Sequence, residues 1–202
     1  MLHLAWHHEL KAGPVGSWYW WIEPTLEPER ARPFARLCRL LRRKYVDERR
    51  RISYALRYTD GTFDPESGDF LTSDGIGLTC ATFVLAVFAS RKVFLIRGEE
   101  WLACRDETRA VEDGAWHQYV VSNLRELIHD KRQRRAAPYE VAELEAHIAA
   151  VEGEMGCARF RPEEVAAAGI AAELPVGFAH AEPVGRRIVE KLRQRFPRPM
   201  TG

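Results

Sequence analysis

The feature that most constrains the fold is an uninterrupted apolar run, LTCATFVLAVFA, at residues 78–89. Its 12 residues have the length of a helix and fall well short of the roughly 20 that a membrane span needs. A helix with this sequence is apolar on every side, so no face of it suits water. We therefore expect a helix buried at the centre of the protein, with the rest of the chain packed around it.

The composition fits a globular protein with one domain, or one domain and a helical addition. The chain has 202 residues, of which 46% are hydrophobic and 29% charged, and its formal net charge is +1. This balance excludes a uniformly basic nucleic-acid binder and a membrane protein. The N-terminus has no signal-peptide pattern and the four cysteines form no Cys-x-x-Cys pair. We therefore expect reduced thiols and a cytoplasmic location.

The small net charge is the sum of two segments with opposite character. Residues 30–51 contain ten basic and two acidic residues, which gives a local charge of +8. Residues 58–90 contain five acidic residues and no Lys or Arg. A helix face exposed to water explains the basic segment, and a contact with an acidic or phosphate-bearing partner is the alternative interpretation. No RNA-binding or helix-turn-helix motif supports a specific nucleic-acid contact.

The periodicity of apolar residues predicts an α+β protein. Residues 2–8 and 17–23 alternate as strands do, and we expect them to form an antiparallel hairpin that turns near Gly13. Residues 52–58 are expected to form either a short strand or an extended entry into the core, residues 60–77 a loop, and residues 93–96 a short strand. Helices are predicted over residues 28–45 or 33–45, 78–89, 116–129, 139–155, from 162 onward and from 183 onward. This pattern divides the chain into a compact part, residues 1–110, and a helical extension, residues 111–202, packed on it.

Cys80 is the strongest candidate for a reactive group. It follows a loop rich in Gly and Asp and opens the apolar helix. A thiol in a first helical turn is close to the positive end of the helix dipole and to free backbone amides, which favour the thiolate and lower its pKa. The same amides can stabilise an oxyanion. A small buried structural residue is the alternative, and the position at the helix start favours the nucleophile.

A nucleophilic cysteine needs a base and a group that orients the base. In a hairpin centred near Gly13, opposed residue numbers add up to 26, which puts His3 opposite Glu23 and His7 opposite Tyr19. His3 is then the favoured base and Glu23 the carboxylate that orients it, as in a Cys-His-acid triad. The long loop also permits a register shifted by two residues, so His7 stays open as the alternative base.

The order of these residues resembles the circularly permuted branch of the NlpC-type papain-like superfamily, which includes relatives of lecithin retinol acyltransferase. His3-Leu4-Ala5-Trp6-His7 is similar to the histidine strand of that branch, and Ile22-Glu23-Pro24 to the end of its next strand. Ser53-Tyr54-Ala55-Leu56 occupies the place of the segment that precedes the cysteine. Thr79 to Val84 is similar to the cysteine motif itself. The resemblance covers about residues 1–96.

The resemblance implies a papain-like α+β fold in which a small antiparallel sheet packs on the cysteine helix. It implies that Cys80 is the nucleophile, His3 the base and Glu23 the orienting group. The implied reaction is acyl transfer from an amide or ester through a thioester on Cys80, with a small-molecule, peptide or lipid acyl substrate. No cofactor and no metal are expected. The substrate-binding candidates are Tyr54, Trp21 and His7.

A different class of function also agrees with the sequence. In this alternative the papain-like fold is catalytically inactive. The protein then acts as a binding module that holds an acidic partner through the Arg-rich face of the helix within residues 30–51. The sequence indicates no oligomeric state.

Overall fold

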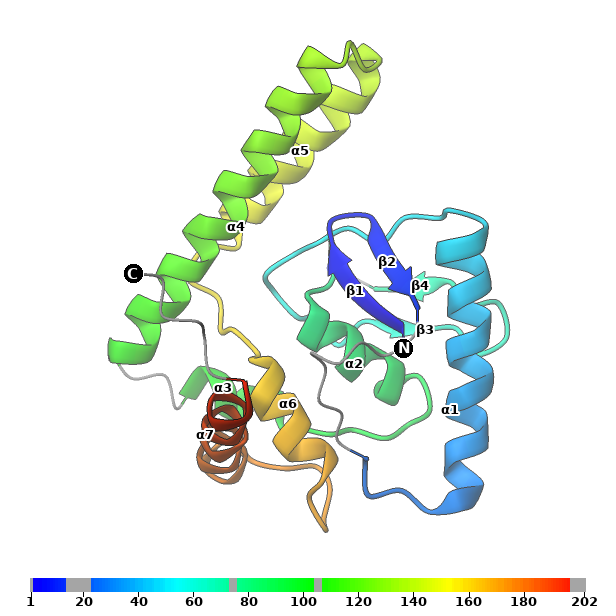
Figure 1. Ribbon diagram of the computed structural model, residues 1–202, viewed down its shortest axis with the longest axis vertical. Helices are drawn as coiled ribbons and strands as arrows, with labels where there is room; N and C mark the ends of the chain where they lie inside the picture. Colours follow the sequence, from blue (N-terminus) through cyan, green and yellow to red (C-terminus); the bar gives the residue numbers. More distant parts are fainter. Residues whose placement is uncertain (1, 14–22, 73–75, 104–106, 197–202) are drawn as a thin grey trace.

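The computed structural model describes residues 2–13, 23–72, 76–103 and 107–196 of the chain. Within these ranges the protein is a mixed α+β structure in which helices predominate and the strands form two small antiparallel sheets (Figure 1). The α+β class predicted from periodicity is therefore confirmed.

Helix α2, Cys80–Ala89, lies at the centre of the molecule, as the apolar run predicts. Its start is fixed by a reciprocal cap: the Thr82 amide donates to the Thr79 hydroxyl at 3.1 Å, and the Thr79 amide donates to the Thr82 hydroxyl at 2.7 Å. Most of α2 is buried, but Cys80 and Val84 are exposed, one turn apart on one side. The cysteine end of the helix therefore faces open space.

The first hairpin differs from the predicted one. Strand β1, Leu2–Trp6, pairs with strand β2, Glu9–Ala12, so Lys11 rather than Glu23 lies opposite His3. Glu23 is exposed and is not part of a strand, and the remainder of the predicted second strand lies outside the described residues. The predicted pairing of His3 with Glu23 across this hairpin is therefore wrong.

The turn of this hairpin lies at His7 and His8 instead of Gly13. His8 has a φ of 61°, in the left-handed region that histidine visits more readily than most residues with a side chain. Its amide donates to the Ile52 carbonyl at 2.9 Å, which ties the turn to the chain that follows the first helix. Strand alternation continues through His8 in the sequence, so the pattern alone did not indicate a turn there.

Helix α1, Pro28–Leu41, continues into a π-helical turn, Arg42–Asp47. Helix α1 is buried against the core through Phe34, Leu37 and Leu41. The chain then runs extended through the core up to residue 58 without joining a sheet, which is one of the two outcomes expected for this segment.

The predicted loop before α2 contains a short hairpin of strand β3, Thr62–Phe63, and strand β4, Phe70–Leu71. Asp64 forms the turn between them, because its carboxylate accepts hydrogen bonds from the amides of Glu66 at 2.9 Å and Ser67 at 2.6 Å. The turn residues were recognised in the sequence, but strands of two residues are too short to show a period.

Within the described part of the chain five helices follow: α3, Gly98–Ala103; α4, Glu107–Gln133; α5, Pro138–Gly153; α6, Pro162–Gly169; and α7, Phe178–Arg195. Helices α4 and α5 form a long antiparallel hairpin that projects from the body (Figure 1). Helix α6 packs against both α2 and α7. None of the helices within the described ranges combines the length and apolar character that crossing a membrane requires.

Two local predictions for the chain after α2 are wrong. Helix α7 begins at Phe178 rather than at Pro183, because the Phe178 amide donates to the Glu100 carboxylate at 2.9 Å and so fixes an earlier start. The strand expected at residues 93–96 is reduced to one parallel bridge between Ile96 and Val176. Both results depend on contacts between segments about 80 residues apart, which local patterns do not contain.

Candidate functional site

Cys80 lies at the edge of an apolar cavity of about 400 Å³. The cavity is bounded by α2, α6 and α7, and Pro24 contributes to its wall from the segment that precedes α1. Its volume lies within the range of small-molecule sites, about 300–1,000 Å³. Among the side chains that line it are Val84, Phe88, Val165, Ile188 and Leu192. An exposed thiol therefore borders a cavity suited to an apolar group.

The Cys80 sulfur has three kinds of polar neighbour. The amides of Cys80 and Ala81 and the hydroxyl of Tyr54 form hydrogen bonds with it, and the Arg159 guanidinium acts on it through its charge. All of these groups favour the thiolate. Desolvation by the surrounding protein is nevertheless the largest effect and raises the pKa of the Cys80 thiol above its ordinary value. The prediction that the helix start lowers this pKa is therefore wrong, although the amide contacts behind that prediction are present.

Tyr54 is brought to Cys80 by hydrogen bonds to its backbone. Its amide donates to Nδ1 of His7 at 3.2 Å, and its carbonyl accepts from Nε2 of His147 at 2.8 Å. A carbonyl only accepts, so Nε2 of His147 carries a proton, whereas Nδ1 of His7 does not. Burial raises the pKa of Tyr54, so its hydroxyl stays protonated and donates to the Cys80 sulfur.

His7 is buried and serves this backbone contact rather than the thiol. Its ring lies 3.7 Å from the His8 ring and 4.4 Å from the His147 ring, between centroids. Burial and the neighbouring positive groups lower the pKa of His7 to about 2 and that of His8 to about 4. His7 also lines a second cavity, of about 390 Å³, together with Lys131 and other polar residues.

His3 lies on β1, which packs against α2. Burial and the Lys11 ammonium lower the pKa of His3, so its ring is neutral at neutral pH. Within the described residues, neither His3 nor Glu23 is a hydrogen-bond partner of the Cys80 thiol. Trp21 lies outside the described residues. The triad of Cys80, His3 and Glu23 therefore stays a prediction.

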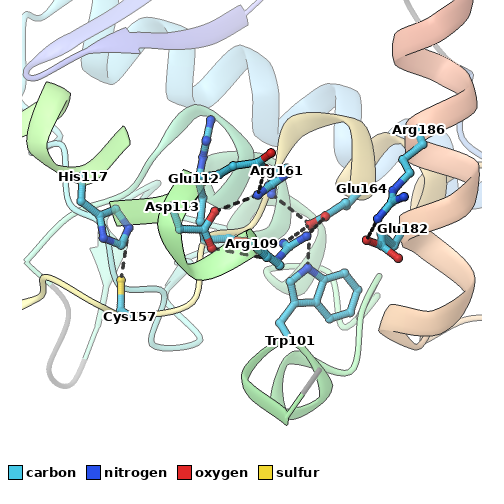
Figure 2. A network of polar contacts seen from close by, with 11 residues as sticks. Trp101, Arg109, Glu112, Asp113, His117, Cys157, Arg161, Glu164, Glu182 and Arg186 are labelled. Atoms are coloured by element: carbon cyan, nitrogen blue, oxygen red, sulfur yellow. Dashed lines mark hydrogen bonds and ion pairs between the residues drawn. The ribbon is translucent and has the colours of Figure 1, made fainter. Parts of the chain in front are cut away.

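The loop between α5 and α6 supplies Arg159 and is held by a buried ionic network (Figure 2). Glu164, which is 2% exposed, accepts hydrogen bonds from Arg109 at 2.5 and 2.9 Å and from the Trp101 indole at 2.8 Å. The Arg109 guanidinium also donates to the Arg159 carbonyl at 3.0 Å. The backbone beside the Cys80 site is thus fixed by side chains from α3, α4 and α6.

The same loop contains a second cysteine with a histidine beside it. Sγ of Cys157 lies 4.0 Å from Nε2 of His117, a side chain of α4 that is fully buried. The Gly156 amide donates to Nδ1 of His117 at 3.3 Å. Figure 2 shows the imidazole pointing from α4 toward the sulfur.

Sequence reasoning missed His117, His147, Glu154 and Arg159, all of which belong to the C-terminal half. Glu154 accepts hydrogen bonds from the amides of Leu56 at 2.8 Å and Arg57 at 3.1 Å, and so holds the segment that carries Tyr54. A signal was present on α5. His147 on α5 and Glu154, which caps its C-terminal end, are two helical turns apart beside the buried apolar residues of that helix. A polar side chain in such a position indicates a specific partner.

Comparisons of the chain with protein-family models, curated proteins and solved structures gave no match. Within the described ranges, no group of three or more His, Cys, Asp or Glu side chains is arranged to hold a metal ion. The function is therefore inferred from the site itself.

Proposed function

We propose that the protein is a cysteine hydrolase or acyltransferase with a papain-like catalytic arrangement, acting on an amide or ester through a thioester on Cys80. The observation that carries the proposal is the position of this thiol. It lies in the first turn of α2, at the edge of an apolar cavity, with backbone amides, a hydroxyl and a guanidinium around the sulfur. An acyl group in the cavity would present its carbonyl carbon to the sulfur.

In the first step the Cys80 sulfur attacks the carbonyl carbon of the substrate. The amides of the first turn of α2 and the Arg159 guanidinium stabilise the charge that develops on the carbonyl oxygen. The leaving amine or alcohol takes up the proton lost by the thiol, and a thioester remains on the sulfur. Water or another acceptor then attacks the thioester and restores the thiol.

The raised pKa of Cys80 makes a base necessary, because the thiol is protonated at neutral pH. His3 is the proposed base. Its lowered pKa leaves the imidazole neutral and ready to accept a proton, and its strand packs against the cysteine helix. Glu23 is the proposed orienting group. It directly precedes Pro24, a residue of the cavity wall. The next residue, Thr25, is held by its amide, which donates to the Gly169 carbonyl at 2.9 Å.

The experiment is a screen of p-nitrophenyl esters and p-nitroanilides with graded acyl chain length. The full chain is compared with its Cys80→Ala variant, and Cys38→Ala is the matched control on α1. We expect loss of turnover by roughly a thousandfold or more in Cys80→Ala alone. Mass spectrometry should find an acyl group on the peptide that contains Cys80. Turnover that survives Cys80→Ala would contradict the proposal.

A specific observation supports the binding module as a second candidate. Arg32, Arg36, Arg39 and Arg43 are exposed and are spaced by four, three and four residues, so they form one stripe opposite the buried face of α1. Within the described ranges only Arg43 of these four has an ion pair, with Glu48 at 3.8 Å. Such a stripe is complementary to a polyanion.

The stripe is tested with polyphosphate as the probe. Changing Arg32, Arg36 and Arg39 to Gln should remove binding and flatten its salt dependence. The matched control changes three exposed arginines of α7, Arg186, Arg187 and Arg193, to Gln. Equal losses in both triple variants would show that only net charge matters.

A further inference from the structure

The loop that joins α5 to α6 carries the second thiol to an open position. Cys157 is partly exposed and lines a cavity of about 470 Å³, separate from the one at Cys80. Arg57, Tyr58 and Phe160 are among the other lining residues. A small polar molecule therefore has room to reach the Cys157 sulfur.

His117 presents a proton donor to that sulfur. The Gly156 amide donates to Nδ1, so the proton of the neutral imidazole is on Nε2, the atom that faces Sγ at 4.0 Å (Figure 2). A hydrogen bond donated to sulfur favours the thiolate over the thiol. Because the His117 side chain is fully buried, its ring is held in this orientation by the packing around it. If His117 served only to hold the loop, its Nδ1 contact with the Gly156 amide would be sufficient. Its Nε2 atom is instead directed at the Cys157 thiol, which borders the cavity.

We propose that Cys157 and His117 form a second reactive-thiol site at which small hydroperoxides oxidise Cys157, and that this oxidation reduces the reactivity of Cys80. In the oxidation the thiolate sulfur attacks the terminal peroxide oxygen. The S–O bond forms as the O–O bond breaks, the sulfur gives up two electrons, and the hydroxide or alkoxide that leaves takes a proton from water. The product is a sulfenic acid, which a small thiol reduces again.

Arg159 links the two sites, because it lies two residues after Cys157 and acts on the Cys80 sulfur. Its guanidinium lies over the Trp116 ring, 4.1 Å from the centroid, and its carbonyl is held by Arg109. An added oxygen on Cys157 changes the contact with His117, whose other ring nitrogen holds the Gly156 amide, and so displaces the residues after it. A guanidinium moved away from Cys80 no longer favours its thiolate, so Cys80 reacts more slowly.

The oxidation is tested on the full chain with hydrogen peroxide, dimedone trapping and mass spectrometry. At pH 7 we expect Cys157 to gain the dimedone adduct roughly tenfold faster than Cys38, which is partly buried on α1. Its alkylation by iodoacetamide should reach half-maximal rate at a lower pH than that of Cys38. Equal rates and equal midpoints for the two thiols would overturn the site. His117→Gln should abolish the difference, and the wild-type pH profile decides the question if that variant does not fold.

The coupling is tested by the alkylation rate of Cys80 before and after peroxide treatment. We expect a severalfold decrease in the wild type and none in Cys157→Ser. Oxidation of Cys157 with an unchanged Cys80 rate would overturn the coupling. The relevance to catalysis rests on the proposed function, whereas these labelling rates do not. A chain that hydrolyses no substrate but shows both effects would contradict the proposed function and leave this inference standing.

Discussion

The two thiols, Cys80 at the start of α2 and Cys157 in the loop between α5 and α6, have complementary surroundings. Cys80 is exposed at an apolar cavity and begins a helix, and no histidine is a hydrogen-bond partner of it within the described residues. Cys157 is less exposed and begins no helix, but a fully buried histidine faces it. Arg159 lies two residues after Cys157 in the chain and contributes to the Cys80 site.

The difference shows that access and activation of a thiol are separate properties. The helix start gives Cys80 the amide contacts that sequence reasoning expects, yet desolvation outweighs them and raises the pKa of the thiol. At Cys157 the activating group is a side chain from a helix 40 residues earlier in the sequence. Substitutions and a change of pH can test this difference between the surroundings of Cys80 and those of Cys157. The largest effect is expected at the network that holds the α5–α6 loop, and the smallest at Lys11.

The largest effect is expected from Glu164→Ala. It leaves the Arg109 guanidinium buried without its main partner, and removing one member of such a pair costs about 3–5 kcal/mol of unfolding free energy. Urea denaturation measures the loss. The matched control is Glu182→Ala, which breaks the exposed pair with Arg186 and should cost only about 0.3–0.5 kcal/mol. Similar losses in both variants would mean that the network does not hold the loop that carries Cys157 and Arg159.

Acid should destabilise the fold beside Cys80 through His7, which holds the Tyr54 amide, and through the neighbouring His8. The folded-state pKa values of His7, about 2, and His8, about 4, lie below the unfolded value near 6.5. The unfolded chain therefore binds protons first, and stability falls as the pH drops from about 6.5 toward 4. Urea midpoints measured between pH 7 and 4 should show this decrease.

The His8→Asn variant tests how much His8 contributes to the loss of stability in acid. Asparagine tolerates the left-handed backbone of residue 8 and does not titrate, so the acid-dependent decrease should be smaller in this variant. His129→Asn, on the exposed side of α4, is the control. An unchanged pH dependence in His8→Asn would assign the effect to other groups.

Tyr54→Phe should act on Cys80 and not on Cys157. The variant removes the hydrogen bond from the Tyr54 hydroxyl to the sulfur, so the pKa of Cys80 rises further. A hydrogen bond contributes about 1 kcal/mol, which corresponds to a roughly fivefold slower alkylation of Cys80 at neutral pH. Tyr58→Phe, at the cavity of Cys157, should leave the Cys80 rate unchanged. If Tyr54→Phe and Tyr58→Phe slow the alkylation of Cys80 equally, the Tyr54 hydroxyl has no specific role at that thiol.

The smallest effect is expected from Lys11→Gln. Lys11 lies opposite His3 and helps to lower its pKa, so its removal raises that pKa. If neutral His3 is the base, the acid limb of the activity profile should move upward by a few tenths of a pH unit. Thr62→Gln, on β3, is an exchange away from His3 that should not move the limb. A limb that stays in place in Lys11→Gln would argue against His3 as the base.

Sequence reasoning performed best where a long pattern settled the outcome. The buried helix α2, the amphipathic helix α1 and the C-terminal helices follow from apolar residues repeated over two or more turns. It failed at the first hairpin, where a histidine at φ 61° replaced the expected glycine turn, and with it failed the register that paired His3 with Glu23. A turn made by a residue that rarely adopts that backbone leaves no local sign in the sequence.

The sequence by itself determined that Cys80 opens a helix too apolar to lie anywhere but in the core. Only the tertiary structure decided what surrounds the thiol. Tyr54 reaches it because His7, His147 and Glu154 hold its segment, and Arg159 reaches it because Arg109 holds a loop nearly 80 residues further along the chain. The pKa of a thiol depends on how much protein and how many charges lie within a few ångströms of the sulfur, and packing between distant segments sets both.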